Sequence, residues 1–143
     1  MARRIGEWRA RLKLPLVAAP MFLISGPDLV LAACREGVIG TFPTPNARTV
    51  AELDEWLNRI VSGLGPDDAP WAANVVVHRS NARLDEDIDL LIRYKAPIVI
   101  TALGSPRAIV ERVHSYGGLV FADAVPYPHL RGPATGRSPL CLP

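Results

Sequence analysis

Several polar or chemically unusual residues lie in or next to short apolar segments of this 143-residue chain. Asn74 is the most informative, because it interrupts the apolar run Trp71–Val77. An amide buried in a strand costs about 1–3 kcal/mol if unpaired, so it must bond either a neighbouring backbone or a ligand. Thr101 and Asp123 end two later apolar segments, and Met21 follows the first. Met21 can pack against a planar cofactor or belong to the core, and Asp123 can contact a ligand or begin a loop.

The remaining candidates are a histidine and two cysteines. His78 follows the segment of Asn74 and can act as a base, contact a ligand or lie in an ordinary loop. Cys34 and Cys141 lack metal-site spacing, and Cys34 is predicted to be a small core residue. The GxGxxG and GxxxxGK[ST] phosphate loops, the HExxH of zinc proteases and the GxSxG of serine hydrolases are absent. A phospho-receiver site is also excluded, because no acidic pair follows the first apolar segment.

The elements that must position these residues follow from the hydrophobic pattern. Five apolar segments predict buried strands, and four amphipathic segments between them predict helices. The strands are Leu16–Pro20, Val38–Phe42, Trp71–Val77, Ile98–Ala102 and Leu119–Phe121. The helices are Pro27–Arg35, Thr49–Ile60, Leu84–Tyr94 and Pro106–Val113. This alternation predicts an α/β fold with a parallel sheet and helical crossovers.

Two architectures fit this order of elements. One is an open five-stranded sheet of the flavodoxin type, which the chain length favours, and the other is an incomplete (β/α)8 barrel of about five βα strands. In both, ligand sites gather where the carboxyl ends of parallel strands meet at one edge of the sheet. We therefore expect the candidate residues Met21, Asn74, Thr101 and Asp123 to lie along that edge.

Composition narrows the class of protein. The chain is 49% hydrophobic and 21% charged, with a net charge of +2, which is typical of a globular protein and gives no reason to expect a nucleic-acid partner. No run of about 18 apolar residues predicts a membrane span, and charged residues interrupt any secretory leader. We expect a cytoplasmic location. Residues 124–143 contain five prolines, two arginines and no acidic residue, and they predict an irregular tail.

Several segments in sequence resemble one enzyme family. They are Leu14–Ser25 with Ala18-Ala19-Pro20-Met21-Phe22, Gly40-Thr41-Phe42-Pro43 with Asn46–Thr49, Trp71–Asn81, Pro97–Gly104 and Val113–Asp123. In this order and spacing they resemble the nitronate monooxygenases, formerly called 2-nitropropane dioxygenases, over roughly residues 5–124. No single segment is decisive, and the resemblance rests on their succession.

The resemblance implies a (β/α)8 barrel that binds FMN noncovalently. Such an enzyme oxidises alkyl nitronates with O2 to carbonyl compounds and nitrite, so its partners are a small nitronate and O2. By position, Met21 and Phe22 would lie along the flavin and Asn74 would bond its ring system. Thr101 and Asp123 would face the same pocket. The implied division is a barrel part at 1–123 and a disordered or frameshifted tail at 124–143.

The sequence also departs from that family. The glycine-rich segment with the catalytic histidine and the loops that hold the FMN phosphate have no counterpart, so no catalytic residue is carried over, and His129 lacks the glycine-rich context. We expect a truncated form that retains little FMN and associates with itself through open barrel edges. The alternatives are an FMN-dependent barrel similar to enoyl-acyl-carrier-protein reductases, a non-enzymatic half barrel completed by a partner, and an open-sheet binding protein.

Overall fold

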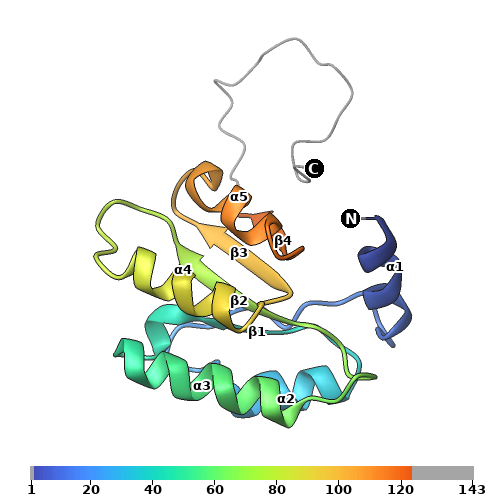
Figure 1. Ribbon diagram of the computed structural model, residues 1–143. Helices are drawn as coiled ribbons and strands as arrows, with labels where there is room; N and C mark the ends of the chain where they lie inside the picture. Colours follow the sequence, from blue (N-terminus) through green and yellow to red (C-terminus); the bar gives the residue numbers. More distant parts are fainter. Residues whose placement is uncertain (1, 124–143) are drawn as a thin grey trace.

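The computed structural model describes residues 2–123, and the tail predicted at 124–143 lies outside them. Helices and strands alternate through the described part (Figure 1). The helices are α1 Ala2–Ala10, α2 Pro27–Arg35, the 3-10 helix η1 Thr44–Asn46, α3 Val50–Gly63, α4 Leu84–Arg93 and α5 Arg107–His114. The strands are β1 Gly40–Pro43, β2 Trp71–Val76, β3 Ile98–Ala102 and β4 Leu119–Ala122. Within residues 2–123, no helix combines the length and apolar character needed to cross a bilayer.

The four strands form one parallel sheet in the order in which they occur along the chain, β1-β2-β3-β4. The register aligns Pro43 with Asn74, Asn74 with Ile100 and Ile100 with Phe121. Residues aligned in a parallel sheet project from the same face, so these four form one row across the sheet. Each strand is linked to the next by a helix, as the alternating pattern predicts.

The first predicted strand, Leu16–Pro20, is only partly formed. Val17 makes a single parallel bridge to Ile39, in which the Ala18 N–H donates to the Ile39 carbonyl at 2.8 Å and the Ile39 N–H donates to the Leu16 carbonyl at 3.1 Å. Leu16 and Val17 remain 54% and 44% exposed. With a neighbour on one side only, the segment has few contacts to keep it regular. The five predicted strands are therefore four full strands and this bridged segment.

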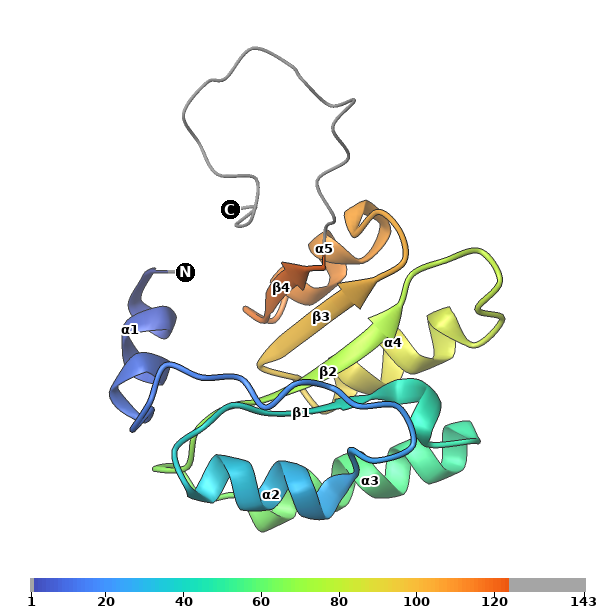
Figure 2. The same cartoon turned by 180° about the vertical axis from the view of Figure 1, so that it is seen from behind.

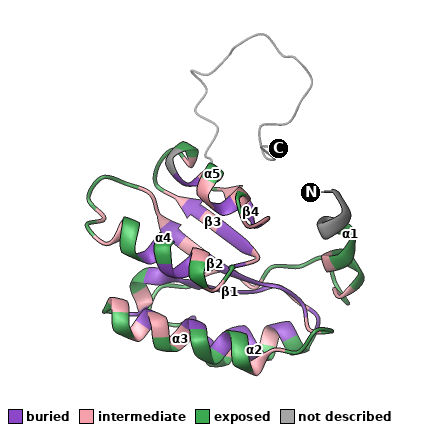
Figure 3. Cartoon of the chain, viewed as in Figure 1, coloured by how far each residue is buried: buried purple, intermediate pink, exposed green. Residues whose placement is uncertain are grey.

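Helices α2 to α5 all pack on the same face of the sheet. One buried cluster joins Val30 of α2, Leu57 of α3, Leu91 of α4 and Val113 of α5 with Val75 of β2. Figure 3 shows buried residues on the strands and exposed residues on the outer sides of these helices. A doubly wound open sheet carries the helices that connect its strands on both faces, whereas here α2 to α5, which connect the strands, share one face. The arrangement therefore excludes the flavodoxin-type alternative and is that of a stretch of barrel wall.

Ion pairs connect neighbouring helices of this layer. In each, an arginine of the later helix contacts a carboxylate of the earlier one. The pairs are Arg59–Asp28 between α3 and α2, Arg93–Asp54 at 3.0 Å between α4 and α3, and Arg112 with Asp85 at 3.1 Å and Asp89 at 2.6 Å between α5 and α4. Because the carboxylates are solvent-exposed, each pair contributes about 0–1 kcal/mol. The pairs follow the order of the helices around the wall.

Helix α1, which is not among the predicted elements, contacts the opposite face of the sheet. Trp8 and Leu12 pack against Ile39, Ala72 and Ile98, which lie at or near the amino ends of their strands. Figure 2 shows α1 apart from the layer of α2 and α3. We call this second face, turned away from α2 to α5, the inner face. Its amino end is covered by α1, whereas its carboxyl end carries the candidate site.

Candidate functional site

Asn74 lies on the inner face, at the carboxyl half of β2. Its neighbours Ala73 and Val75 belong to the cluster on the helix side, so the alternation of a strand places Asn74 on the other side. Its row partners Ile100 and Phe121 pack against the apolar cluster of that inner face. Asn74 is therefore a polar group set among apolar side chains.

The amide of Asn74 makes one hydrogen bond within residues 2–123. Its Nδ2 donates to the Ile100 carbonyl of the adjacent strand at 3.2 Å. Its Oδ1 accepts no hydrogen bond from any residue in the described range 2–123. Of the two possibilities that the sequence left open, the backbone partner thus accounts for one of the two N–H donors of the amide. The acceptor side stays available on the inner face, and the side chain is only partly buried.

The loop after the bridged segment presents four successive apolar side chains to solvent. Met21, Phe22, Leu23 and Ile24 are 39%, 65%, 72% and 69% exposed. An exposed apolar patch on a soluble protein commonly marks a contact surface. This apolar loop begins at the carboxyl end of the first predicted strand, so it lies at the same edge of the sheet as the carboxyl end of β2.

Thr101 and Asp123 occupy different faces of the sheet. Thr101 aligns with Val75, which faces the helices, and its buried hydroxyl lies 3.4 Å from the Phe121 carbonyl. Thr101 therefore does not share a face with Asn74. Asp123 continues the ladder through its N–H, which donates to the Thr101 carbonyl at 2.9 Å, and alternation from Phe121 places it on the inner-face side. Its carboxylate is exposed, and the structure shows no ion pair to it within residues 2–123. Cofactor binding by Thr101 and Asp123 stays a prediction.

His78 forms a local turn with Ser80. Its Nδ1 accepts a hydrogen bond from the Ser80 N–H at 3.3 Å and lies 2.8 Å from the Ser80 hydroxyl. The residue is exposed, and its bonds are those of an ordinary loop residue.

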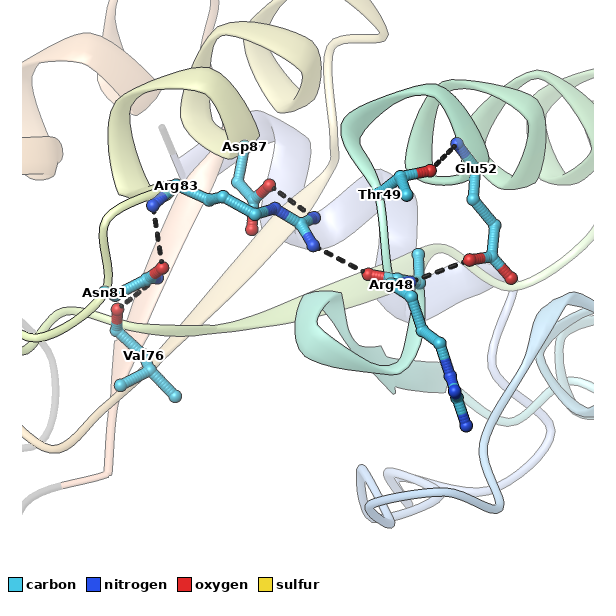
Figure 4. A network of polar contacts seen from close by, with 8 residues as sticks. Arg48, Thr49, Glu52, Val76, Asn81, Arg83 and Asp87 are labelled. Carbon is cyan, nitrogen blue, oxygen red and sulfur yellow. Dashed lines mark hydrogen bonds and ion pairs between the residues drawn. The ribbon is translucent and has the colours of Figure 1, made fainter.

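Arg83 ties together the loops that follow β1 and β2 (Figure 4). Its Nη1 donates to the Ala47 carbonyl at 2.9 Å, and its Nη2 pairs with the buried Asp87 at 2.9 Å. Asn81 donates from Nδ2 to the Val76 carbonyl at 2.9 Å and accepts from the Arg83 N–H at 3.2 Å. These bonds fix the carboxyl edge of the sheet, because they hold one loop against the other.

A hollow of about 180 Å³ lies at the opposite, amino edge of the sheet. Its lining includes Arg11, Asp68, Trp71, Tyr94 and Lys95. Ligand pockets usually enclose about 300–1,000 Å³. The hollow is too small for a flavin-sized ligand, and it lies away from Asn74 and the apolar loop.

Nucleophilic and metal chemistry find no support in the described residues. The Cys34 thiol is fully buried, burial raises its pKa to about 11, and its Sγ lies 3.6 Å from the Pro70 carbonyl. Its burial confirms the prediction that Cys34 is a small core residue. A buried thiol with a raised pKa is also a poor nucleophile. Across residues 2–123 no group of three or more histidine, cysteine, aspartate or glutamate side chains is arranged to hold a metal ion.

Asn46 is the site residue that the sequence analysis missed. It lies in η1, directly after β1, and its side chain bonds three backbone groups of the apolar loop. Buried Ser25 adds a fourth bond, because its Oγ accepts from the Met21 N–H at 2.9 Å. An asparagine after a strand is also a common turn residue, so its spacing alone gives no sign of a contact more than twenty residues away.

The arrangement of strands and helices matches known structures. FabK from Thermotoga maritima and its M276A mutant each superpose with a TM-score of 0.69 at 18% sequence identity. The match covers 83% of this chain and 36% and 38%, respectively, of those chains. No protein-family model matches the sequence, and no curated protein matches it. This chain thus spans less than two-fifths of the length of the FabK structures.

These likenesses establish the fold. FabK is a TIM barrel, and the parallel sheet described here, with helices α2 to α5 on one face, corresponds to part of such a barrel. The fold is an incomplete (β/α)8 barrel. In barrels of this kind, active sites lie at the carboxyl ends of the strands, which is the edge that carries Asn74 and the apolar loop.

Proposed function

We propose that this chain is the N-terminal part of an FMN-binding barrel of the nitronate-oxidising type. Three observations support the proposal: the succession of family-like segments, the barrel wall, and the set of groups at its carboxyl edge. The observation that carries it is the amide of Asn74, which lies among apolar inner-face residues with an acceptor atom free of any partner in residues 2–123.

The groups at this edge fit a flavin ring. A flavin has an apolar dimethylbenzene end and a pyrimidine end with an N–H donor. Asn74 Oδ1 suits the donor, whereas Phe121 and the exposed side chains of Met21 and Phe22 suit the apolar ring surface. Asp123 lies on the same side and can contact polar ring substituents. The phosphate has no counterpart among these groups, because Asp123 and Asn74 Oδ1 are acceptors, not donors.

FMN held here would supply the redox chemistry of nitronate oxidation by O2, which yields a carbonyl compound and nitrite. The chain's own residues would bind and orient the ring. Asn74 would hold its pyrimidine edge, and the apolar loop would shield one region of it from water. No residue of this chain matches the family's catalytic histidine, so ring binding is the primary property to test.

The test compares FMN with riboflavin, which lacks the phosphate. Titration of the 143-residue chain, followed by flavin fluorescence, is expected to give similar affinities for both, because ring contacts alone hold them. We expect the flavin to be lost on gel filtration. Asn74→Ala is expected to weaken binding about tenfold, the effect of one hydrogen bond of about 1.4 kcal/mol. Asn58→Ala, on the exposed face of α3, is the matched control.

Two results would contradict the proposal. One is the absence of binding for both flavins at millimolar concentration, and the other is unchanged affinity in Asn74→Ala. The reaction type is tested separately with the flavin-saturated chain. Oxygen consumption on addition of an alkyl nitronate supports nitronate oxidation, whereas NADH oxidation with an enoyl thioester supports the enoyl-reductase alternative.

We also propose that the outer edge of the bridged segment Leu16–Pro20, which lies next to β1, pairs with a second copy of the chain. Leu16 and Val17 are exposed there, and an edge strand offers unpaired backbone groups to another chain. Val17→Lys is expected to shift the chain towards monomer in sedimentation velocity, because edge lysines block strand pairing. A wild-type chain that stays monomeric at 100 µM (about a typical upper working concentration) would refute this proposal.

A further inference from the structure

We propose that Asn46 is a positioning residue that holds the apolar loop in the conformation that receives the flavin ring. The inference rests on the proposed function, since it assigns a role within the same site. Asn46 lies outside the loop and comes from the segment after β1. Its place in the fold therefore links the loop to the sheet that carries Asn74.

The side chain of Asn46 bonds the loop at both of its ends and at its centre. Its Oδ1 accepts from the Leu23 N–H at 2.9 Å. Its Nδ2 donates to the Met21 carbonyl at 3.0 Å and to the Ser25 carbonyl at 2.8 Å. One amide thus uses both its donor and its acceptor atoms on three backbone groups spread over five residues.

The conformation of the loop depends on such polar bonds. Four of its side chains are exposed, so burial does not fix their positions. Leu23 has a φ of 63°, in the left-handed region that a leucine rarely adopts. Such a conformation persists only when the surroundings impose it. The bonds from Asn46 come from outside the loop, and they add to the bonds that Ser25 and Ile24 make within it.

These bonds leave one backbone donor free. The Ile24 and Ser25 N–H groups donate to the Met21 carbonyl at 3.2 and 3.0 Å. The Met21 N–H donates to Ser25 Oγ, and the Leu23 N–H donates to Asn46. Phe22 alone in this loop has an N–H without an acceptor among the described residues.

The bonds to Asn46 therefore hold the Phe22 N–H donor in one direction, next to the exposed side chains of Met21 to Ile24. A planar heteroaromatic ring with acceptor atoms on its edge, such as a flavin, matches that combination. Without Asn46, the Leu23 N–H and two carbonyls would turn to water, and the Phe22 N–H would no longer have a set direction. Asn46 therefore acts on the ring through the loop and does not touch it.

The experiment uses the full 143-residue chain with riboflavin as the probe. Three variants are compared with the wild type: Asn46→Ala removes all three bonds, Asn46→Asp keeps only the acceptor for the Leu23 N–H, and Asn81→Ala is a control. Asn81 also bonds the backbone of a loop, but in the segment after β2. The readouts are riboflavin affinity, visible circular dichroism of bound riboflavin, and hydrogen exchange of the Leu23 amide without flavin.

For Asn46→Ala we expect at least tenfold weaker riboflavin binding, at least tenfold faster Leu23 exchange, and an altered circular dichroism band at saturation. In Asn46→Asp a carboxylate oxygen replaces the amide nitrogen that faces the Met21 and Ser25 carbonyls, so weaker riboflavin binding is expected as well. This variant tests the inference if Asn46→Ala does not fold. Asn81→Ala is expected to leave Leu23 exchange unchanged.

The inference is overturned if both Asn46 variants bind riboflavin as the wild type does with the same dichroism band. It is also overturned if the wild type binds no flavin, in which case the proposed function fails at the same time. The two failures are distinguishable by the wild type. If the wild type binds riboflavin and the Asn46 variants bind it equally well, only the role of Asn46 fails. If the wild type binds no flavin, the proposed function fails too.

Discussion

Gly40 offers the sharpest test of how the sheet and its helices fit together. A Cβ added at this position would lie 2.5 Å from the carbonyl oxygen of Val30 and 2.8 Å from its Cα. Both atoms belong to the backbone of α2, so no side-chain rotation can relieve the contact. Gly40→Ala must push β1 away from α2, at the point where the chain enters the strand that leads to Asn46.

Overpacking of a core costs about 1–3 kcal/mol, and a clash with backbone falls at the upper end of that range. We therefore expect Gly40→Ala to lower the free energy of unfolding by about 3 kcal/mol, a large part of the 5–15 kcal/mol typical of a domain. Urea denaturation followed by tryptophan fluorescence measures the difference. Gly65→Ala is the control, because its Cβ would meet only the Asp68 carboxylate, at 3.6 Å. A loss below about 0.5 kcal/mol in Gly40→Ala, the range of neutral surface changes, would refute the close packing of α2 on β1.

Two further predictions concern ionisation and surface charge. Burial raises the pKa of the Cys34 thiol from 9.0 to about 11. The thiol therefore ionises first in the unfolded chain, and the free energy of unfolding falls as pH rises from 9 towards 11, by at most about 3 kcal/mol. Cys34→Ala should abolish this fall, which urea titrations between pH 8 and pH 10 measure. Burial also raises the pKa of Tyr116 to about 12, which adds a loss of the same sign above pH 10. Arg112→Ala removes two ion pairs of about 0–1 kcal/mol each, because the partners Asp85 and Asp89 are 91% and 72% exposed, and it should cost no more than about 2 kcal/mol. A cost above about 2 kcal/mol in the same denaturation assay would contradict the low value given to these surface pairs.

Elements with a strong local signal are predictable from the sequence. The bounds of α2, Pro27–Arg35, agree with the prediction, since a proline begins the helix and Gly37, with a φ of 74°, follows its end. The bounds of β3, Ile98–Ala102, also agree. The predicted helix Thr49–Ile60 corresponds to α3, and Thr49 caps it, because its hydroxyl accepts a hydrogen bond from the Glu52 N–H at 3.1 Å.

Features that depend on distant partners are not predictable in this way. The segment Leu16–Pro20 has the composition of a strand, but its pairing depends on how many neighbours it has. The parity of Thr101 relative to Asn74 depends on strand register, which a list of apolar segments does not contain. The three bonds of Asn46 join residues more than twenty positions apart in the sequence, and no local pattern predicts them.

The choice between an open sheet and a barrel wall depends on which face of the sheet each helix covers, and the sequence shows this only in part. The order of strands and helices is the same in an open sheet and in a barrel wall. The sequence shows which side of each helix is apolar, but it does not show on which face of the sheet that helix packs. The shared cluster of Val30, Leu57, Leu91 and Val113 decides this point.

The contact of α1 with the inner face bears on how a small molecule reaches the site. Trp8 and Leu12 close off the strand starts around Ala72 and Ile98 with apolar side chains. The amino end of the inner face is thus lined by apolar side chains, whereas Trp8 and Leu12 are not among the partners of Asn74 at the carboxyl end. Under the proposed function, a ring bound at Asn74 would lie on the side of Met21 to Ile24 and away from Trp8.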